Sequence, residues 1–309
     1  MAPETRAEIR RVAARLGYAP NLLARGLLTG RSGLVAVVVN TVADLWDTFF
    51  FDKLFQALQG IGKQPLIVHT HAAPDLKGVL RDGASYQVDG VLVFADNVTA
   101  AMAKSAFATP AIVMMNRLDR PADRVDAVRL DERTELERLV EALVRSGRRR
   151  LSYVSGRPTA SFADERFLAV RDALARHDLV PFGPATGGAF SYEAGAAAAR
   201  TLLGSASPRP DAILCACDAM AFGVVDVARS RGLRIPADLS VVGFDDIPPA
   251  AWPSYDLTTI HQNVDDLIAG AVDLLQSRLA APGRRARVRV LETRIVLRST
   301  TQAGLDGYL

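Results

Sequence analysis

Leu34-Val35-Ala36-Val37-Val38-Val39-Asn40 is the stretch of this 309-residue chain that decides its fold. Residues 34–39 are continuously apolar and rich in β-branched valine, and they lack the alternation of a strand that has one face in water. A strand of this kind is buried on both faces, as in a parallel sheet that helices cover on either side. We therefore predict an α/β fold whose first strand lies at residues 34–40.

Strand and helix patterns alternate along the chain that follows this run. We expect strands at 66–70, 90–95 and 111–116, with helices at 50–61, 76–86 and 99–107. A second series follows residue 131, with strands expected at 151–155, 212–216 and 239–244 and helices at 132–146, 163–177, 192–203 and 219–231. Such alternation is typical of parallel sheets wound with helices. The two series predict two similar subdomains, followed by a helix at 264–281 and strands within 288–297.

The amino-terminal segment differs in charge from the rest of the chain. Residues 1–31 hold six arginines and two glutamates, a net charge of +4, so the remaining residues carry −1 because the whole chain carries +3. Any attraction to a phosphate backbone therefore lies in this segment. A first short helix is expected to end near Gly17, ahead of Pro20. Asn21 can cap a second, two-turn helix that ends before Gly30.

Composition excludes several protein classes. The chain is 49% hydrophobic and 23% charged, an ordinary balance for a globular protein. Charged residues follow Met1 where a signal peptide would have an apolar segment, and no uncharged run is long enough to span a membrane. The two cysteines, Cys215 and Cys217, are too few for a disulfide framework. We therefore expect a cytoplasmic protein that does not bind membranes.

Several segments resemble the LacI/GalR family of transcriptional regulators. The amino-terminal match consists of Leu16-Gly17-Tyr18-Ala19-Pro20-Asn21, Ala24-Arg25, Leu27 and Thr29-Gly30-Arg31-Ser32. More specific matches lie at 211–213, 218–223, 234–247 and 257–260, and the resemblance covers nearly all of residues 3–301. It implies a core of the periplasmic-binding-protein type I. Two similar doubly wound parallel-sheet subdomains would be joined by three crossovers, near Asp131, near His261 and after the 264–281 helix.

The resemblance also implies domain boundaries. Residues 1–18 match the third helix of a helix-turn-helix headpiece, and 19–32 match the hinge helix and linker. The expected core subdomains comprise 33–130 plus 262–284 and 131–261 plus 285–302, with a tail at 303–309. The first two headpiece helices of the family have no counterpart in this sequence. We therefore do not expect this chain to carry the helix that reads the major groove.

The hinge segment carries the predicted DNA contacts. In the family the hinge helix folds on operator DNA, and a paired leucine wedges into the minor groove, a known way to kink DNA. The positions that match the family are Asn21, Ala24, Arg25 and Leu27, with Leu27 at the wedge position. The alternative for these residues is an ordinary interdomain linker.

Two charged residues are the main candidates for an effector site between the subdomains. Asp245, in Gly243-Phe244-Asp245-Asp246, follows a predicted strand at the edge where open α/β sheets bind ligands. The resemblance implies that Asp245 accepts hydrogen bonds from ligand hydroxyls, and the alternative is a turn with a helix-capping aspartate. Arg166 matches the family arginine, whose planar fork suits a sugar diol or a carboxylate. The alternative is a surface arginine paired with Asp164 or Glu165.

Further candidates rest on the resemblance alone. Cys217 stands where the family often has a ligand-binding asparagine, so the effector or its pose is expected to differ from that of common sugars. Phe49, Phe190 and Trp252 match aromatic positions at the cleft, with core packing as the alternative. Asn116 and Asp131 match other cleft-facing positions.

Other motifs give little indication of catalysis or metal binding. The His69-x-His71 pair lacks a neighbouring carboxylate motif, and buried structural cysteines are favoured over a metal or redox site at 215–217. Walker, GxSxG and HExxH motifs are not found. We predict a non-enzymatic, ligand-responsive transcriptional repressor that forms homodimers and needs no cofactor. It would bind operator DNA and a small-molecule effector, with carbohydrate as the family expectation. The alternative is a solute-binding protein of the same fold without DNA binding.

Overall fold

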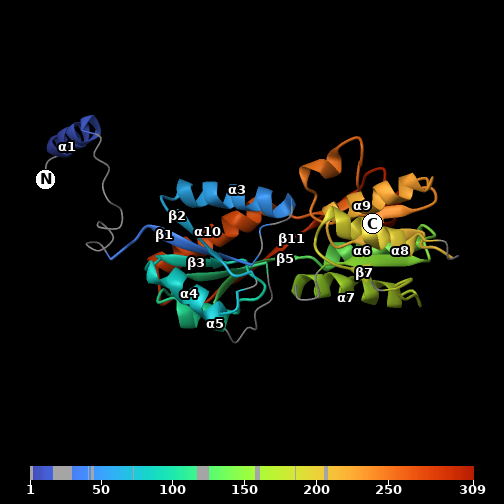
Figure 1. The fold of residues 1–309 in the computed structure, drawn as a ribbon, viewed down its shortest axis with the longest axis horizontal. Coiled ribbons are helices and arrows are strands. Elements are labelled where there is room, and N and C mark those ends of the chain that lie inside the picture. Colours follow the sequence, from blue (N-terminus) through green and yellow to red (C-terminus); the bar gives the residue numbers. More distant parts are fainter. Residues whose placement is uncertain are drawn as a thin grey trace.

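The computed structural model describes residues 3–16, 30–40, 42, 45–71, 73–116, 125–156, 161–184, 186–204 and 208–309. Two lobes lie end to end along the long axis of the molecule (Figure 1). Helix α1 (Pro3–Arg15) lies beyond the outer end of the first lobe. The described part of the linker, residues 30–33, leads directly into the first strand of that lobe.

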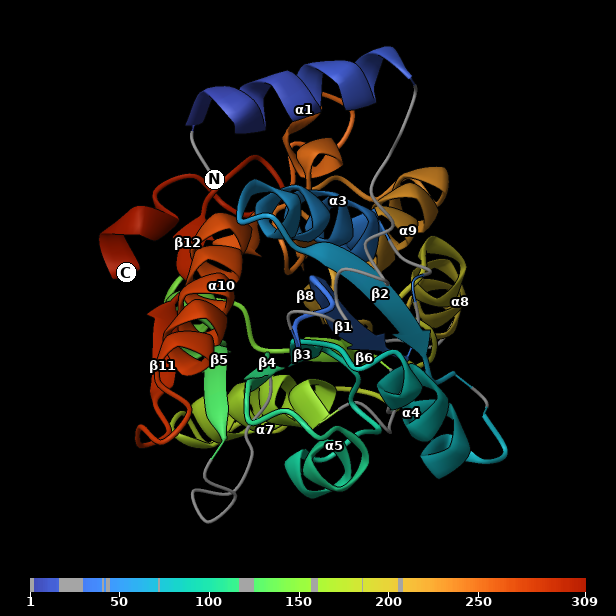
Figure 2. The same ribbon diagram turned by 90° about the vertical axis from the view of Figure 1, so that its left-hand side faces the viewer.

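The first lobe is built on a six-stranded parallel sheet with the order β11-β5-β4-β3-β1-β2. Its strands are β1 (Leu34–Val39), β2 (Gln64–His69), β3 (Gly90–Val93), β4 (Ile112–Met115), β5 (Asp126–Asp131) and β11 (Val288–Glu292). Helices α3 (Leu45–Gly60) and α10 (Val264–Ala280) cover one face, and α4 (Leu76–Ser85) and α5 (Ala100–Ala106) cover the other (Figures 1 and 2). The predicted doubly wound arrangement is therefore confirmed for this lobe.

The first strand shows why the sheet needs helices on both faces. Val35, Val37 and Val39 of β1 lie in the hydrophobic core beneath α3. Ala36 and Val38 lie in a separate core beneath α4 and α5. Because successive side chains of a strand point to opposite faces, an uninterrupted apolar run leaves neither face for water.

The second lobe has a four-stranded parallel sheet with the order β7-β6-β8-β9. Its strands are β6 (Leu151–Ser155), β7 (Thr186–Gly187), β8 (Ala212–Cys215) and β9 (Ser240–Val242). Its helices are α6 (Thr134–Arg145), α7 (Ser161–Ala175), α8 (Tyr192–Leu202) and α9 (Asp218–Ser230). Helix α6 packs on α7, and α8 packs on α9. A short 3-10 helix, η2 (Pro248–Ala251), follows β9, and another, η3 (Leu305–Tyr308), ends the chain.

Within the described ranges the chain crosses between the lobes three times. It passes from β5 to α6, from β10 (Thr259–His261) to α10, and from β11 to β12 (Arg294–Val296). Strands β10 and β12 pair antiparallel at the junction. The Thr293 hydroxyl of the third crossover donates a hydrogen bond to the Asp131 carbonyl of the first, at 2.7 Å. The crossovers therefore run side by side and are tied together.

Three sequence-based expectations need correction. Strand β11 pairs with β5 in the first lobe, so residues 288–292 do not belong to the second subdomain, and the third crossover falls at Thr293. Strand β5 itself was missed, because only three of its six residues are apolar. Helix α3 begins at Leu45 rather than at Phe50, because the ring of Trp46 stacks on that of Phe50 and extends the buried face of the helix.

The ranges described above contain no helix that is both long and apolar enough to cross a membrane.

Helices α8 and α9 are in backbone contact, which gives a test of the second lobe. A Cβ added at Gly195 of α8 would lie 2.0 Å from the Met220 carbonyl oxygen of α9. Because a backbone atom cannot rotate aside, Gly195→Ala is expected to destabilise the protein by about 1–3 kcal/mol in urea unfolding. At Gly60, near the end of α3, an added Cβ meets nothing within 4 Å. Gly60→Ala is the control, and equal stability of the two variants would contradict this packing.

Candidate functional site

Arg166 lies at the centre of a buried polar cluster between the two sheets. Its side chain is 3% exposed, and its Nε and Nη2 donate to Oε2 and Oε1 of Glu132, each at 2.9 Å. Nη1 donates to the Ala216 carbonyl, and the guanidinium lies 3.7 Å from the centre of the Phe244 ring. Arg166 is therefore buried, and the alternative of a surface arginine is wrong.

The partners of Arg166 come from the carboxyl ends of strands in both lobes. Glu132 directly follows β5, and Asn116, which follows β4, donates from Nδ2 to Glu132 Oε1 at 3.4 Å. Ala216 follows β8, and Phe244 lies just after β9. Carboxyl ends of parallel strands are where open α/β sheets bind ligands, so this cluster lies where the fold favours a binding site.

Opposite charges more than offset the cost of burying Arg166. Burial alone lowers the pKa of its guanidinium, but Glu132 and Asp245 raise it above its usual value. Arg166 therefore stays charged in the interior, with two carboxylates close enough to stabilise it.

Asp245 is held in a strained conformation beside this cluster. Its φ is +119°, in a region that residues other than glycine rarely adopt. Its backbone N–H donates to the Ile260 carbonyl at 2.9 Å, and its Oδ1 accepts a hydrogen bond from Gln262 Nε2. Ile260 and Gln262 belong to the second crossover, so the crossover itself supports this carboxylate.

Asp218 and Asp246 attach the loop that carries Asp245 to the junction. Asp218 Oδ2 accepts from the Ile247 N–H at 2.9 Å, and its Oδ1 accepts from the Thr259 hydroxyl at 2.6 Å. Asp246 accepts from Arg298 at 2.6 Å and lies 2.9 Å from His261 Nδ1. These contacts bind the loop to both β10 and the segment that follows β12.

Buried polar atoms near the cluster lack partners. The Tyr153 hydroxyl and Gln262 Oε1 have no hydrogen-bond partner in the part of the chain that the structure describes. Tyr153 is 6% exposed and lies within electrostatic reach of Arg166, Glu132 and Cys217. An unsatisfied buried polar atom costs about 1–3 kcal/mol and is rare in native proteins. These atoms are candidates for ligand contacts, although no sequence signal singled out Tyr153 or Gln262.

The three predicted aromatic residues lie in different environments. Phe190 is buried, and its ring lies where a Cβ of Gly156 would be, 2.0 Å from ring atom Cζ. Phe49 and Trp252 are instead 39% and 55% exposed. Sequence reasoning missed Trp46, whose ring centre lies 4.8 Å from that of Phe50 and 5.6 Å from that of Phe94. Its Nε1 lacks a hydrogen-bond partner among the described residues.

The remaining predicted residues divide into two groups. Asn116 joins the Arg166–Glu132 pair, and Cys217 is buried at the start of α9. The carboxylate of Asp131 instead caps α6, accepting from the Thr134 hydroxyl at 2.6 Å and from two backbone N–H groups. The hinge positions Asn21, Ala24, Arg25 and Leu27 lie outside the described residues.

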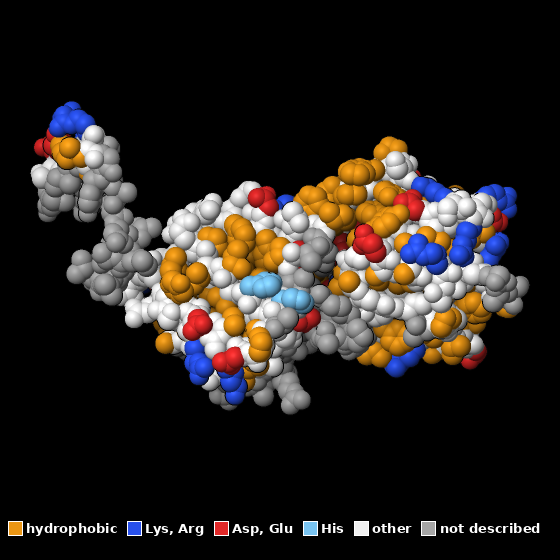
Figure 3. Space-filling model, viewed as in Figure 1, with side chains coloured by type: hydrophobic (Ala, Val, Ile, Leu, Met, Phe, Trp, Pro, Cys, Tyr) orange, Lys and Arg blue, Asp and Glu red, His pale blue; other side chains and the backbone are white. Residues whose placement is uncertain are grey.

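The histidine and cysteine pairs do not form a metal cluster. The rings of His69 and His71 are 6.1 Å apart, and histidine side chains lie next to one another on the face shown in Figure 3. Cys215 and Cys217 are buried and are not joined by a disulfide, and burial raises the pKa of Cys215. Across the described ranges, no group of three or more histidine, cysteine or acidic side chains is placed to hold a metal ion.

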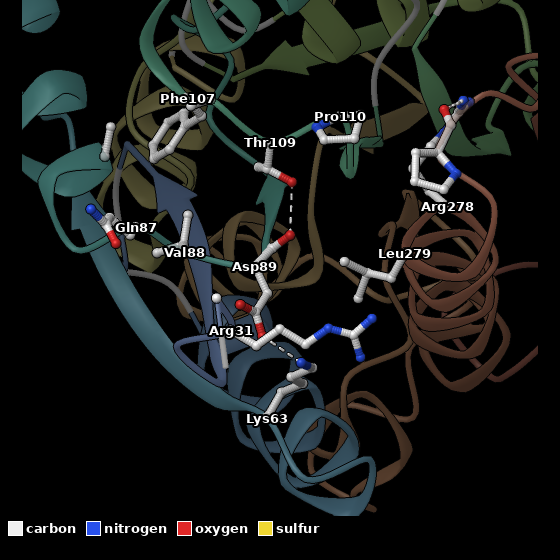
Figure 4. A pocket seen from close by; sticks show the side chains of 14 residues that line it. Arg31, Lys63, Gln87, Val88, Asp89, Phe107, Thr109, Pro110, Arg278 and Leu279 are labelled. Atoms are coloured by element: carbon white, nitrogen blue, oxygen red, sulfur yellow. Dashed lines mark hydrogen bonds and ion pairs between the residues drawn. The ribbon is translucent and has the colours of Figure 1, made fainter. Parts of the chain in front are cut away.

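A pocket of about 570 Å³ lies at the other end of the first lobe, where the linker enters (Figure 4). Asp89 in its wall accepts from the backbone N–H groups of Ser32 at 2.9 Å and Gly33 at 3.0 Å, and from Lys63 Nζ at 2.6 Å. Burial raises the pKa of Asp89, but Lys63 and the backbone donors lower it below its usual value. Asp89 therefore anchors the linker to the sheet as a carboxylate.

Comparisons of the sequence and of the structure with known proteins point to the same fold and to the same group of relatives. Residues 140–301 match the family described as periplasmic binding protein-like domain. The chain is 30% identical to the ribose operon repressor of Haemophilus influenzae over 306 residues, which covers 96% of this chain and 90% of that protein. The relatives found by sequence are regulators of transcription, not enzymes.

Two solved structures show the same architecture. One is the lac repressor dimer bound to operator and an anti-inducer, with a TM-score of 0.86, 23% identity and coverage of 98% of this chain and 92% of that chain. The other is the transcriptional regulator CelR in complex with cellobiose, with a TM-score of 0.77, 26% identity and coverage of 97% and 91%.

Asp218 should make stability depend on pH. Burial raises the pKa of this carboxyl to about 7, although hydrogen bonds from Thr259 and Ile247 act in the opposite direction. The unfolded value is near 3.8. The folded protein therefore retains a proton that the unfolded chain releases, and this contribution to stability is lost as the pH rises through about 7.

An asparagine at position 218 cannot ionise. We expect the difference in Tm between Asp218→Asn and the wild type to shift in favour of the variant as the pH is raised from about 5 to about 8. A difference that stays constant over this range would show that Asp218 does not titrate there.

Asp89→Asn tests how the linker is anchored. An amide has one acceptor oxygen and its NH2 group would face other donors, so the linker should detach more often. We expect trypsin to cleave after Arg31 roughly tenfold faster, which corresponds to about 1.4 kcal/mol in local opening. Asp75→Asn, at the exposed cap of α4, is the matched control. Equal cleavage rates in the two variants would argue against the anchor.

Proposed function

Because the chain belongs to the LacI/GalR family of transcriptional regulators, we propose that it is a repressor whose effector binds at the Arg166 cluster. The effector is a sugar or a related polyhydroxyl metabolite. Its binding changes how the hinge segment contacts operator DNA. The observation that carries this proposal is the buried cluster of Arg166, Glu132 and Asp245, which brings together strand ends from both lobes.

The chemistry of the cluster favours a polyhydroxyl ligand. Each sugar hydroxyl both donates and accepts, and the site presents both kinds of group. Gln262 Oε1 can only accept, and the Tyr153 hydroxyl can both donate and accept. A ligand that hydrogen-bonds to these atoms offsets the cost of burying them without partners. The ring of Phe190 adds an apolar surface for a sugar face.

The relatives support this ligand class. One is named as a ribose operon repressor, and another was solved with cellobiose. Phe49, Trp252, Cys217, Asn116 and Asp131 remain proposed contacts from the family resemblance. Of these, Asn116 is supported by its hydrogen bond to Glu132.

The route from effector to DNA follows from the connections between the lobes. An effector that bridges both lobes changes their relative orientation, and the three crossovers let them rotate without breaking either sheet. The linker is attached to the first lobe through Asp89, so it moves with that lobe. In the proposed homodimer two linkers change their separation, and Asn21, Ala24, Arg25 and Leu27 lose or gain their DNA contacts. Operator binding must then change effector affinity by the same factor.

Two substitutions test the effector site, with D-ribose and cellobiose as probes. Asp245→Asn removes a charged acceptor and is expected to weaken binding about 10–100-fold in calorimetry. Tyr153→Phe is expected to weaken it about fivefold without lowering the Tm of the free protein, because its hydroxyl has no partner to lose among the described residues. The matched readout is operator affinity in a gel-shift assay with and without the sugar.

Two outcomes would contradict the proposal. One is sugar binding that neither substitution weakens. The other is an operator affinity that no sugar changes.

A further inference from the structure

Glu132 already occupies the guanidinium fork of Arg166. The pair is bidentate, with both N–O distances at 2.9 Å, and the two side chains are only 3% and 5% exposed. The remaining terminal nitrogen, Nη1, donates to the Ala216 carbonyl. Parallel bidentate bonding is the geometry by which an arginine would bind the carboxylate or phosphate of a ligand. Here the protein supplies that carboxylate itself.

Two further carboxyl groups, of Asp245 and Glu165, lie within electrostatic reach of this pair, and Arg129 and Arg133 lie within reach of Glu165. Asp245, which is 8% exposed, lies close enough to raise the pKa of Arg166. Burial, followed by repulsion from Glu132, raises the pKa of Glu165 on the adjoining turn of α7. Within the cluster itself, one guanidinium faces the two carboxylates of Glu132 and Asp245. A ligand entering here meets a site without surplus positive charge.

We propose that Glu132 is a specificity-determining residue that makes this site reject acidic ligands. The site takes neutral polyhydroxyl compounds, or compounds that carry an amine, in preference to sugar acids and sugar phosphates. This inference rests on the proposed function in one respect only, namely that a small molecule binds at the Arg166 cluster.

The reason is the cost of displacing Glu132. An anionic ligand can use the arginine fork only if the Glu132 carboxylate gives it up, which would leave a buried charge without its partner. If both anions stay, they repel each other at short range. A neutral hydroxyl or an ammonium group avoids both costs, because it can donate to Glu132 or Asp245 while the ion pair stays intact. Gln262 Oε1 and the Tyr153 hydroxyl offer further acceptors.

Inorganic sulfate provides a probe that does not depend on knowing the effector. The Tm is measured against sulfate concentration at constant ionic strength, with chloride as the replacement anion. The wild type should show no saturable response. Glu132→Gln keeps the size of the side chain and one acceptor for Arg166 but removes the competing charge. It should bind sulfate at least tenfold more tightly than the wild type, with a saturable rise in Tm.

Two control variants locate the effect. Glu165→Gln removes a nearby carboxyl group whose pKa is also raised by Glu132. Among the described contacts, the Glu165 side chain makes no hydrogen bond to Arg166. This variant should respond like the wild type. The double variant Glu132→Gln/Arg166→Gln should lose the sulfate response gained by the single one. Sulfate binding to the wild type that depends on Arg166, or no gain in Glu132→Gln, would overturn the proposal.

A second measurement on the wild type covers the case in which Glu132→Gln does not fold. D-ribose and D-ribose 5-phosphate differ by one phosphate, and ribose is expected to bind at least tenfold more tightly. Equal or tighter binding of the phosphate would overturn the proposal. Failure of both to bind would count against the proposed sugar effector, and a saturable sulfate response of the wild type would still overturn the role of Glu132.

Discussion

The buried ion pair between Arg166 and Glu132 is the interaction on which the site depends. An isolated charge in this interior would cost several kcal/mol, so neither residue could be there without the other. The pair also connects the lobes, since Glu132 directly follows a strand of the first lobe and Arg166 lies on a helix of the second. Its geometry fixes the neighbouring Asn116 and Phe244 and sets the charge that any ligand meets.

Much of the fold could be predicted from local pattern. The run at 34–40 is apolar on both faces, and this required two helical layers, as found. What escaped prediction depends on distant partners. Strand β5 is half polar and was missed. Residues 288–292 were expected as a strand but were assigned to the wrong lobe, because β11 pairs with β5 across about 160 residues of sequence. No local window contains that information.

The site was predicted unevenly, for a similar reason. The family resemblance identified Arg166 and Asp245, but it gave no sign that Glu132 would pair with the arginine. Nothing in a single sequence reports which carboxylate folds onto which guanidinium. Tyr153 and Gln262 were missed because they stand out only by a missing contact. Each has a buried polar atom without a hydrogen-bond partner among the described residues. That deficit becomes visible only when the surrounding atoms are in place.

The backbone contact between α8 and α9 has a mechanical consequence. Where glycine lets two helix backbones touch, no layer of side chains between them can give way, so α8 and α9 resist sliding past each other. In the proposed mechanism, rotation of one lobe relative to the other takes place at the three crossovers. Strand β1 runs from the linker toward the crossovers, so the linker lies at the end of the first lobe that is far from them (Figure 1). A small rotation at the crossovers would therefore move the linker more than the rest of the first lobe. The size of this displacement would grow with the length of the lobe.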